Sequence, residues 1–246
     1  MEHVFTIITI VRNCLPELKR TFLSLKDQKN QSFEWIVIDA ASTDGTVEWL
    51  ESVSDFKDRF FWLSEPDDGI SDAWNKGISL AKGKQVLLLN AGDTYDSDLL
   101  ACFAEHVDDS KITCCHARKL SEKGDYLGVF EACPSKLWRG MHIPHNWCSV
   151  PLKFYTEFGL YSKIPHSMDF EWFHRFFKQK GSEGFYVINQ TLGDFRGGGH
   201  SEVFYSDAFK ANEVILKNSG MSPALALLVR LTYVFKHKAM LFVSKF

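Results

Sequence analysis

The protein has 246 residues, of which 45% are hydrophobic, and a formal net charge of −3. This length can hold one large domain, or a core with an appendage, and is long enough to bury a sizeable hydrophobic core. Because the charge is so close to neutral, we expect no nucleic-acid partner.

The cysteines and the apolar runs indicate a cytoplasmic protein. The six cysteines show neither a C-x-x-C pair nor zinc spacing, which is typical of reduced thiols in a cytosolic protein. They are Cys14, Cys102, Cys114, Cys115, Cys133 and Cys148. The first apolar run begins at Val4 without a basic segment before it, so we expect no signal peptide. No apolar run approaches the ~20 residues that span a bilayer.

Strands and helices are predicted to alternate through the first half of the chain. Apolar, β-branched runs predict strands at residues 4–11, 35–38, 60–63 and 86–89. Apolar residues at helical spacing predict helices at 16–26 and 68–80. A further helix is predicted between them, capped by Ser42 or Thr43. This alternation favours an α/β fold with a parallel, doubly wound sheet.

The stretch QVLLLNAGD, from Gln85 to Asp93, joins a buried strand to a polar turn. A small turn that ends in a carboxylate suits a ligand crevice at the carboxyl edge of an open α/β sheet. Hard cations such as Mg²⁺ and Mn²⁺ prefer oxygen ligands, and Asp93 can supply one. The alternative is a polar turn that only caps a core strand, since Asn, Gly and Asp are common in turns.

The pattern is less regular after Asp93. Helices are predicted at 98–107, 154–160 and 168–180, and strands at 112–116, 126–130 and 185–188. Residues 138–150 are predicted to be irregular, and residues 197–199 to form a flexible glycine loop. No low-complexity linker separates these parts, so we expect one integrated unit.

The C-terminal stretch differs in charge from the rest of the chain. Residues 217–246 contain five Lys and Arg but no Asp or Glu, and Ser222-Pro223 is typical of a helix start. On a helical projection Arg230, His237, Lys238, Ser244 and Lys245 gather on one side, and apolar residues cover most of the remainder. Two hypotheses fit this pattern: a helix that lies on an anionic membrane surface, or one that docks on the protein or on a second subunit.

Three stretches, in this order, resemble family 2 glycosyltransferases of the GT-A fold, particularly bacterial enzymes that build surface polysaccharides. They are VFTIITIVRN, WIVIDAASTDGT and SEPDDGISDAWNKGISLAKGKQVLLLNAGD. The resemblance extends more weakly through PHNWCSVPLKFYTEFGLY, SMDFEWFHRF and FRGGGHSE. It implies a GT-A domain at residues 1–205, in which 1–95 bind the nucleotide sugar and 96–205 the acceptor. Residues 206–246 would then form a helical segment for membrane association or oligomerisation.

The resemblance also implies a reaction. The donor would be a nucleotide-diphosphate sugar, the acceptor a glycan or a lipid-linked sugar, and the cofactor Mn²⁺ or Mg²⁺. Transfer would invert the anomeric carbon. The protein would be cytoplasmic. We further expect that it contacts the cytoplasmic face of the inner membrane or forms a homo-oligomer.

On the donor side, the resemblance assigns roles to four residues of the first half. Asp39 would face the base or ribose, although Ala40 stands where many members carry a second aspartate. Asp72, Asn75 and Lys76 share one helix face and would line the donor pocket, with Lys76 near phosphate. A turn aspartate and a solvated helix face are the alternatives.

The metal site implied by the resemblance is a reduced one. Asp93 takes the place of the final aspartate in the family's D-x-D-like motif, while Asn90 and Gly92 stand where other members carry carboxylates. We therefore expect Asn90 near the substrate and a low affinity for metal in the absence of donor.

On the acceptor side, Asp169 matches the aspartate that removes the proton from the acceptor hydroxyl, and Glu171 is the nearest competing carboxylate. Asp169 could instead be only a helix cap. His145 resembles a family histidine near the acceptor, with a structural histidine as the alternative. His200 follows three glycines and would contact diphosphate or metal.

Two other function classes compete with the glycosyltransferase. A sugar nucleotidyltransferase needs a glycine-rich, basic loop after the first strand, which VRNCLPEL lacks. A non-catalytic nucleotide-sugar binding protein would explain the reduced metal motif, but both Asp93 and Asp169 are retained.

Overall fold

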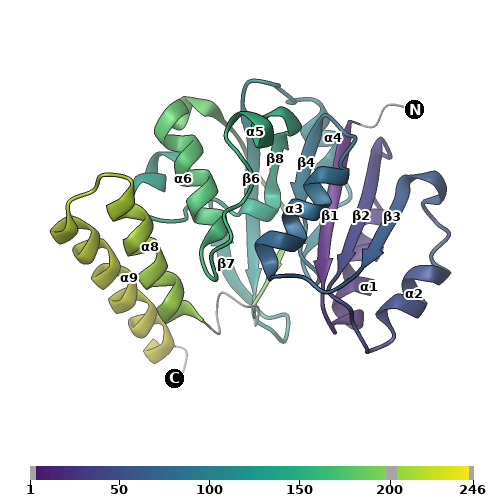
Figure 1. Ribbon diagram of the computed structural model, residues 1–246, viewed down its shortest axis with the longest axis horizontal. Helices are drawn as coiled ribbons and strands as arrows, with labels where there is room; N and C mark the ends of the chain where they lie inside the picture. Colours follow the sequence, from purple (N-terminus) through teal and green to yellow (C-terminus); the bar gives the residue numbers. More distant parts are fainter. Residues whose placement is uncertain (1–3, 198–203, 244–246) are drawn as a thin grey trace.

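The computed structural model describes residues 4–197 and 204–243 (Figure 1). The strands of this described part form one mixed sheet: β1 (Phe5–Val11), β2 (Phe33–Asp39), β3 (Phe60–Ser64), β4 (Gln85–Leu88), β5 (Thr94–Tyr95), β6 (Ile112–Leu120), β7 (Tyr126–Phe130), β8 (Cys148–Pro151) and β9 (Phe185–Arg196). Their order is β3-β2-β1-β4-β8-β6-β9-β5, and β7 pairs with β6 outside this path.

The first four strands run parallel, as predicted from their alternation with helices. β8 is antiparallel to both β4 and β6, whereas β6 and β9 are parallel. The α/β class and the parallel first half of the sheet are therefore confirmed. The carboxyl ends of β1, β2 and β4 lie along one edge, the lower edge in Figure 1.

Helices cover both faces of this sheet. The α-helices are α1 (Leu15–Lys26), α2 (Thr46–Ser52), α3 (Ile70–Leu80), α4 (Leu99–Ala104), α5 (Leu152–Glu157), α6 (Met168–Lys180), α8 (Tyr205–Asn218) and α9 (Pro223–Val243). Short 3-10 helices are η1 (Lys57–Arg59), η2 (Pro134–Arg139), η3 (His145–Trp147) and η4 (Ser182–Gly184). α1, α2 and α4 pack in the core on one face, and α3, α5 and α6 in the core on the other.

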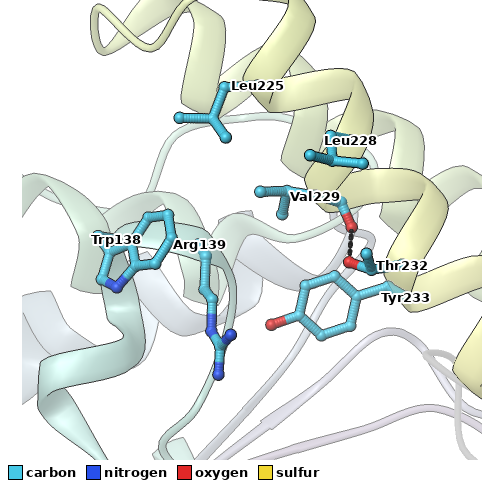
Figure 2. Close-up of a pocket in the computed structure, with 7 residues that line it drawn as sticks. All are labelled: Trp138, Arg139, Leu225, Leu228, Val229, Thr232 and Tyr233. Carbon is cyan, nitrogen blue, oxygen red and sulfur yellow. Dashed lines mark hydrogen bonds between the residues drawn. The ribbon is translucent and has the colours of Figure 1, made fainter.

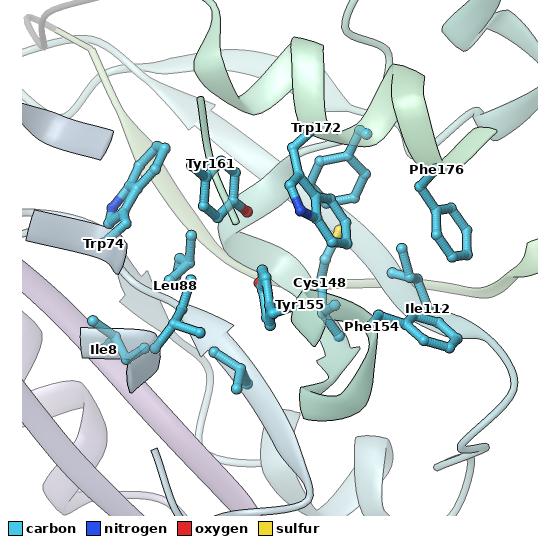
Figure 3. Close-up of a cluster of buried hydrophobic side chains, with 14 of the residues drawn as sticks. Ile8, Trp74, Leu88, Ile112, Cys148, Phe154, Tyr155, Tyr161, Trp172 and Phe176 are labelled. Carbon is cyan, nitrogen blue, oxygen red and sulfur yellow. The ribbon is translucent and has the colours of Figure 1, made fainter. Parts of the chain in front are cut away.

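The alternation of side chains along β1 explains the two cores. Ile7 is buried among the residues of α1 and α4, whereas Ile8 is buried with those of α3 (Figure 3). α3 lies especially close to the sheet at Gly77, where an added Cβ would approach Ile8 Cγ2 to 2.4 Å. This close packing fixes the helix that carries three of the predicted donor residues.

The predicted cap of α2 is wrong. The helix begins at Thr46, after Gly45 in the left-handed conformation, and no side chain caps it. Ser42 instead donates hydrogen bonds to Asp39, so its hydroxyl is committed to the end of β2. Asp44 accepts from the backbone and hydroxyl of Thr46 and ties the start of α2 to α1.

The second half differs more from the prediction. Residues 138–150 are not wholly irregular, because they contain η3 and most of β8, which lies in the middle of the sheet. β9 extends to Arg196, well past the predicted end at residue 188. α6 has the bounds predicted for it, whereas α4 is shorter than the predicted 98–107.

The C-terminal helices form a hairpin at the far end of the molecule from β3 (Figure 1). Ala226 and Val229 of α9 are buried with Phe170 of α6 and Leu216 of α8. One face of α9 is thus docked on the protein, as one of the two hypotheses expected. Within the described ranges, we find no helix with the length and apolarity that crossing a membrane requires.

Candidate functional site

A rigid turn follows β4 at the carboxyl edge of the sheet. Gly92 adopts a φ of 101°, which glycine takes without strain. Thr21 of α1 accepts a hydrogen bond from Gly92 N (3.0 Å) and donates one to Asp93 O (2.9 Å). Asp93 is therefore presented from a turn that is fastened to both β4 and α1.

The Asp93 carboxylate is buried, because the residue as a whole is only 5% exposed. Its Oδ1 accepts a hydrogen bond from Arg196 N (2.9 Å), and its Oδ2 accepts one from Asn146 Nδ2 (2.5 Å). Burial raises the pKa of Asp93 to about 7, against the opposing effect of the two donors. A nearby positive charge would favour the ionised form of this carboxylate.

His145 and Asp169, predicted to lie on the acceptor side, are brought together. His145 Nδ1 on η3 lies 3.4 Å from Asp169 Oδ2 in the first turn of α6. The imidazole also meets the ring of Trp74 edge-on, with centroids 5.4 Å apart. Burial lowers the pKa of His145, and the Asp169 charge only partly offsets this. A neutral imidazole is therefore favoured beside the Asp169 carboxylate.

Asn146 is a site residue that the sequence analysis missed. It is almost fully buried and follows His145 directly, so two consecutive residues of η3 reach the two carboxylates. The Tyr95 hydroxyl donates to Asn146 O (2.6 Å) and holds this turn in place. The signal was present in the segment PHNW, because a buried amide next to a candidate site histidine needs polar partners.

Asp39 lies at the end of β2, as predicted, and is fully buried. Its carboxylate accepts hydrogen bonds from the backbone and hydroxyl of Ser42 and from Ser64 Oγ (2.6 Å). These contacts bind the ends of β2 and β3 together. A role for Asp39 toward the base or ribose stays a prediction.

Asp72, Asn75 and Lys76 share one face of α3, where they contact neighbouring loops. Lys76 pairs with Glu65 (2.7 Å) and Asp72 (3.2 Å), and Lys163 pairs with Asp72 (3.2 Å). A hydrogen bond from the backbone of Asp68 and these lysines lower the pKa of Asp72. Asp72 and Lys76 therefore stand in a charged network, and the contact of all three residues with a donor stays a prediction.

Asn75 has a different set of partners. Its Nδ2 donates to Tyr161 O (2.9 Å), and its Oδ1 accepts from Tyr161 N (3.0 Å). Both ends of the amide are thus used to clamp the backbone that leads from α5 to α6. Asn75 joins the donor-side helix α3 to the segment that precedes Asp169.

A cavity of about 230 Å³ opens beside the Asp93 turn. Its lining comprises Arg20, Gly92, Thr94, Leu120, Gly124, Asp194 and Arg196. Asp194 is paired with Arg118 (2.5 Å), and the Nε of Arg196 is buried without a hydrogen-bond partner among the described residues. Two arginines next to a glycine turn suit an anionic group such as a phosphate.

The residues around Asp93 fit a hard divalent cation that arrives with a diphosphate. Asp93 offers one carboxylate, and Asn90 Oδ1 in the same turn is buried without a hydrogen-bond partner in the described part of the chain. No group of three or more His, Cys, Asp or Glu among the described residues could hold a metal by itself. Mg²⁺ is commonly held by one or two carboxylates together with substrate phosphates. His200 lies outside the described residues.

Parts of the chain are similar in sequence to proteins named as glycosyltransferases or polysaccharide synthases. An uncharacterized glycosyltransferase of Mycobacterium tuberculosis is 39% identical over 91 residues, which cover 37% of this chain and 34% of that protein. The chondroitin synthase of Pasteurella multocida is 25% identical over 169 residues, or 65% of this chain and 17% of the synthase. The chain thus matches about a third or less of the length of these relatives.

Solved structures show the same fold at low sequence identity. S. aureus TarS 1–349 in complex with UDP-GlcNAc superposes with a TM-score of 0.66 at 15% identity, covering 96% of this chain and 72% of that one. The mannosyltransferase PcManGT from Pyrobaculum calidifontis, in complex with GDP-Man and Mn²⁺, gives 0.60 at 17% identity, covering 94% and 80%. These likenesses confirm the GT-A fold.

The family assignment rests on a sequence match that is longer than those to the two relatives above. The sequence profile of glycosyl transferase family 2 matches residues 6–180, which run from β1 to the end of α6 and include Asp93, Asn146 and Asp169. The chain therefore belongs to glycosyl transferase family 2.

Proposed function

We propose that this protein is an inverting, metal-dependent glycosyltransferase. It would move a sugar from a nucleotide-diphosphate sugar to a hydroxyl of a glycan or lipid-linked acceptor in bacterial surface polysaccharide synthesis. One observation carries the proposal: the consecutive η3 residues His145 and Asn146 contact Asp169 and Asp93 respectively. In this proposal residues 1–95 bind the donor and residues 96–205 the acceptor.

The proposed chemistry is a single displacement. Asp169 accepts the proton of the acceptor hydroxyl while that oxygen attacks the anomeric carbon, and the bond to the nucleoside diphosphate breaks. His145, kept neutral by burial, holds the Asp169 carboxylate from one side. Arg20 and Arg196 line the cavity next to Asp93 and would stabilise the negative charge that develops on the leaving diphosphate.

Asp93, with Asn90 beside it, would hold the divalent cation. A bound Mn²⁺ or Mg²⁺ supplies further neutralisation of the diphosphate charge. The structure of PcManGT contains Mn²⁺ together with GDP-Man, which supports this part of the proposal. We propose that the reaction takes place in the cytoplasm.

A non-catalytic nucleotide-sugar binding protein is the second candidate. It is favoured by the burial of Asp93 and by the use of both carboxylate oxygens in hydrogen bonds. Turnover separates the two candidates, because a binding protein would show a donor-induced thermal shift and no released nucleoside diphosphate.

The experiment that tests the proposal begins with a thermal-shift screen of UDP-, GDP- and dTDP-sugars with Mn²⁺, because a ligand of the native state raises its apparent stability. Release of nucleoside diphosphate is then measured with the best donor. Asp93→Asn should remove most of the activity without unfolding the protein. A variant that keeps a near wild-type rate at saturating Mn²⁺ would contradict the metal role of Asp93.

A further inference from the structure

The outward side of α9 carries a row of exposed apolar side chains, which we call the α9 face. It consists of Leu225, Leu227, Leu228, Leu231 and Phe235. Leu228 is 58% exposed, Leu231 50% and Phe235 74%. The opposite side of the helix is fixed on α6 and α8 through Ala226 and Val229, so the face has a defined orientation. A contiguous exposed apolar patch of this kind marks an interaction site.

An aromatic and a basic side chain extend this face beyond the helix. A cavity of about 180 Å³ lies between η2 and α9, with Trp138 and Arg139 on one side and Leu225 and Leu228 on the other (Figure 2). Trp138 is 43% exposed, and the Arg139 guanidinium lies 5.8 Å from the centre of its ring. Half-exposed tryptophan beside arginine is typical of the boundary between lipid headgroups and acyl chains.

The charges around the α9 face distinguish between its possible occupants. Lys136 and Arg139 flank Trp138 on η2. Glu213 pairs with Arg230, and after Glu213 the sequence has no Asp or Glu but carries Lys236, Lys238 and Lys245. Two copies that met through this face would bring like charges together, whereas an anionic surface would neutralise them. Charge complementarity therefore favours lipid over a second copy of the chain.

We propose that the α9 face, together with Trp138, docks on an anionic lipid bilayer, with α9 lying in the plane of the headgroups. Leu228, Leu231 and Phe235 enter the acyl boundary, and Arg139 binds lipid phosphate.

The test is co-sedimentation of the full chain with vesicles. Vesicles of equal parts phosphatidylglycerol and phosphatidylcholine should bind the protein, vesicles of phosphatidylcholine alone should bind it weakly, and high salt should weaken binding. The double variant Leu228→Glu, Leu231→Glu should lower the partition coefficient at least about tenfold, since it removes apolar insertion and adds negative charge. Arg139→Ala should lower it about fivefold on the anionic vesicles only.

Leu23→Glu is the matched control. Leu23 is 57% exposed, as Leu228 is, but lies on α1 at the other end of the molecule. Its variant should sediment like the wild type. The proposal would be overturned if Leu23→Glu lowered vesicle binding as much as the Leu228→Glu, Leu231→Glu double variant does. It would also be overturned if the wild type did not bind the anionic vesicles. A third contradicting outcome is a dimer in light scattering that the double variant converts to a monomer, in a protein that binds no vesicles.

Donor affinity, measured by calorimetry on the same variants, keeps this test separate from the proposed function. The surface variants should bind the nucleotide sugar as the wild type does. If no nucleotide sugar binds the wild type while vesicles still do, the proposed function fails and lipid docking stands.

Discussion

Consecutive residues of η3 serve two carboxylates that lie on different elements. His145 contacts Asp169 on α6, and Asn146 donates to Asp93 after β4. A small rotation of this short turn would therefore break both contacts at once. Asp93 and Asp169 are 76 positions apart in the sequence, and η3 contacts both of them.

Asp169→Asn should lower transfer steeply while leaving donor affinity nearly intact. General base catalysis contributes ~10²–10⁴-fold, and the amide keeps the shape of the side chain but cannot take a proton. Calorimetry gives donor affinity, and release of nucleoside diphosphate gives the rate.

Glu171→Gln is the control for that variant. Glu171 accepts a hydrogen bond from Ser162 (2.9 Å) and pairs with Arg175 (3.1 Å), so its contacts are structural. Loss of donor binding in Asp169→Asn would place Asp169 in the donor pocket. A larger loss of rate in Glu171→Gln would move the base to Glu171.

Asn146→Ala should raise the Mn²⁺ concentration needed for half-maximal turnover. The change leaves Asp93 Oδ2 without its amide donor, and a hydrogen bond to a charged group contributes about 1.5–3 kcal/mol. Thermal shift on adding Mn²⁺ and nucleoside diphosphate measures the same loss without turnover. Asn189→Ala, which removes an exposed amide bonded to His116, is the control. A lower melting temperature with unchanged metal dependence would show that Asn146 is only structural.

α3 connects the two halves of the molecule at the level of elements. Its apolar side packs on the sheet through Gly77 and Trp74, and its polar side contacts the segment between α5 and α6. Asn75 supplies the direct connection, because its amide makes both a donor and an acceptor contact with the backbone of Tyr161. Asn75, which is predicted to line the donor pocket, thus also holds the segment that precedes α6.

Asn75→Ala should lower the free energy of unfolding by about 1–3 kcal/mol, because two hydrogen bonds are lost and backbone groups are left unpaired. Urea unfolding measures the change. Ser79→Ala on the same helix is the control, since Ser79 is exposed and donates to Lys76 O within the helix itself. If Asn75→Ala weakens donor binding and leaves the free energy of unfolding unchanged, Asn75 acts in the donor pocket and its structural role is contradicted.

At the scale of the whole molecule, a buried histidine joins three elements that are distant in the sequence. His174 of α6 lies 3.0 Å from Leu137 O of η2 through Nδ1, and 2.9 Å from Ser219 Oγ after α8 through Nε2. Burial lowers the pKa of His174 below its ordinary value of 6.5. The folded state therefore binds this proton less well than the unfolded state does.

The sign of this shift predicts a dependence of stability on pH. Because the folded pKa is lowered, the contribution of His174 to stability is complete above pH 6.5 and is lost as the pH falls through the folded pKa. His174→Gln should therefore show a shallower fall in the free energy of unfolding below pH 6.5 than the wild type. Urea unfolding at a series of pH values provides the curves, and parallel curves for the two proteins would contradict the assignment.

Local patterns in the sequence were enough for the α/β class, the parallel first half, the bounds of α6 and the place of Asp93 at the end of a buried strand. Each follows from hydrophobic periodicity or turn chemistry within a short window of residues. The tertiary structure alone decided the rest. β8 has only four residues and no alternation, so its place between β4 and β6 came from pairing with distant strands. The bond from Asn146 to Asp93 spans 53 positions, and the partners of Asp39 and Asn75 are likewise set by packing. A single sequence carries the period of each element, but which polar groups meet across elements depends on how those elements pack.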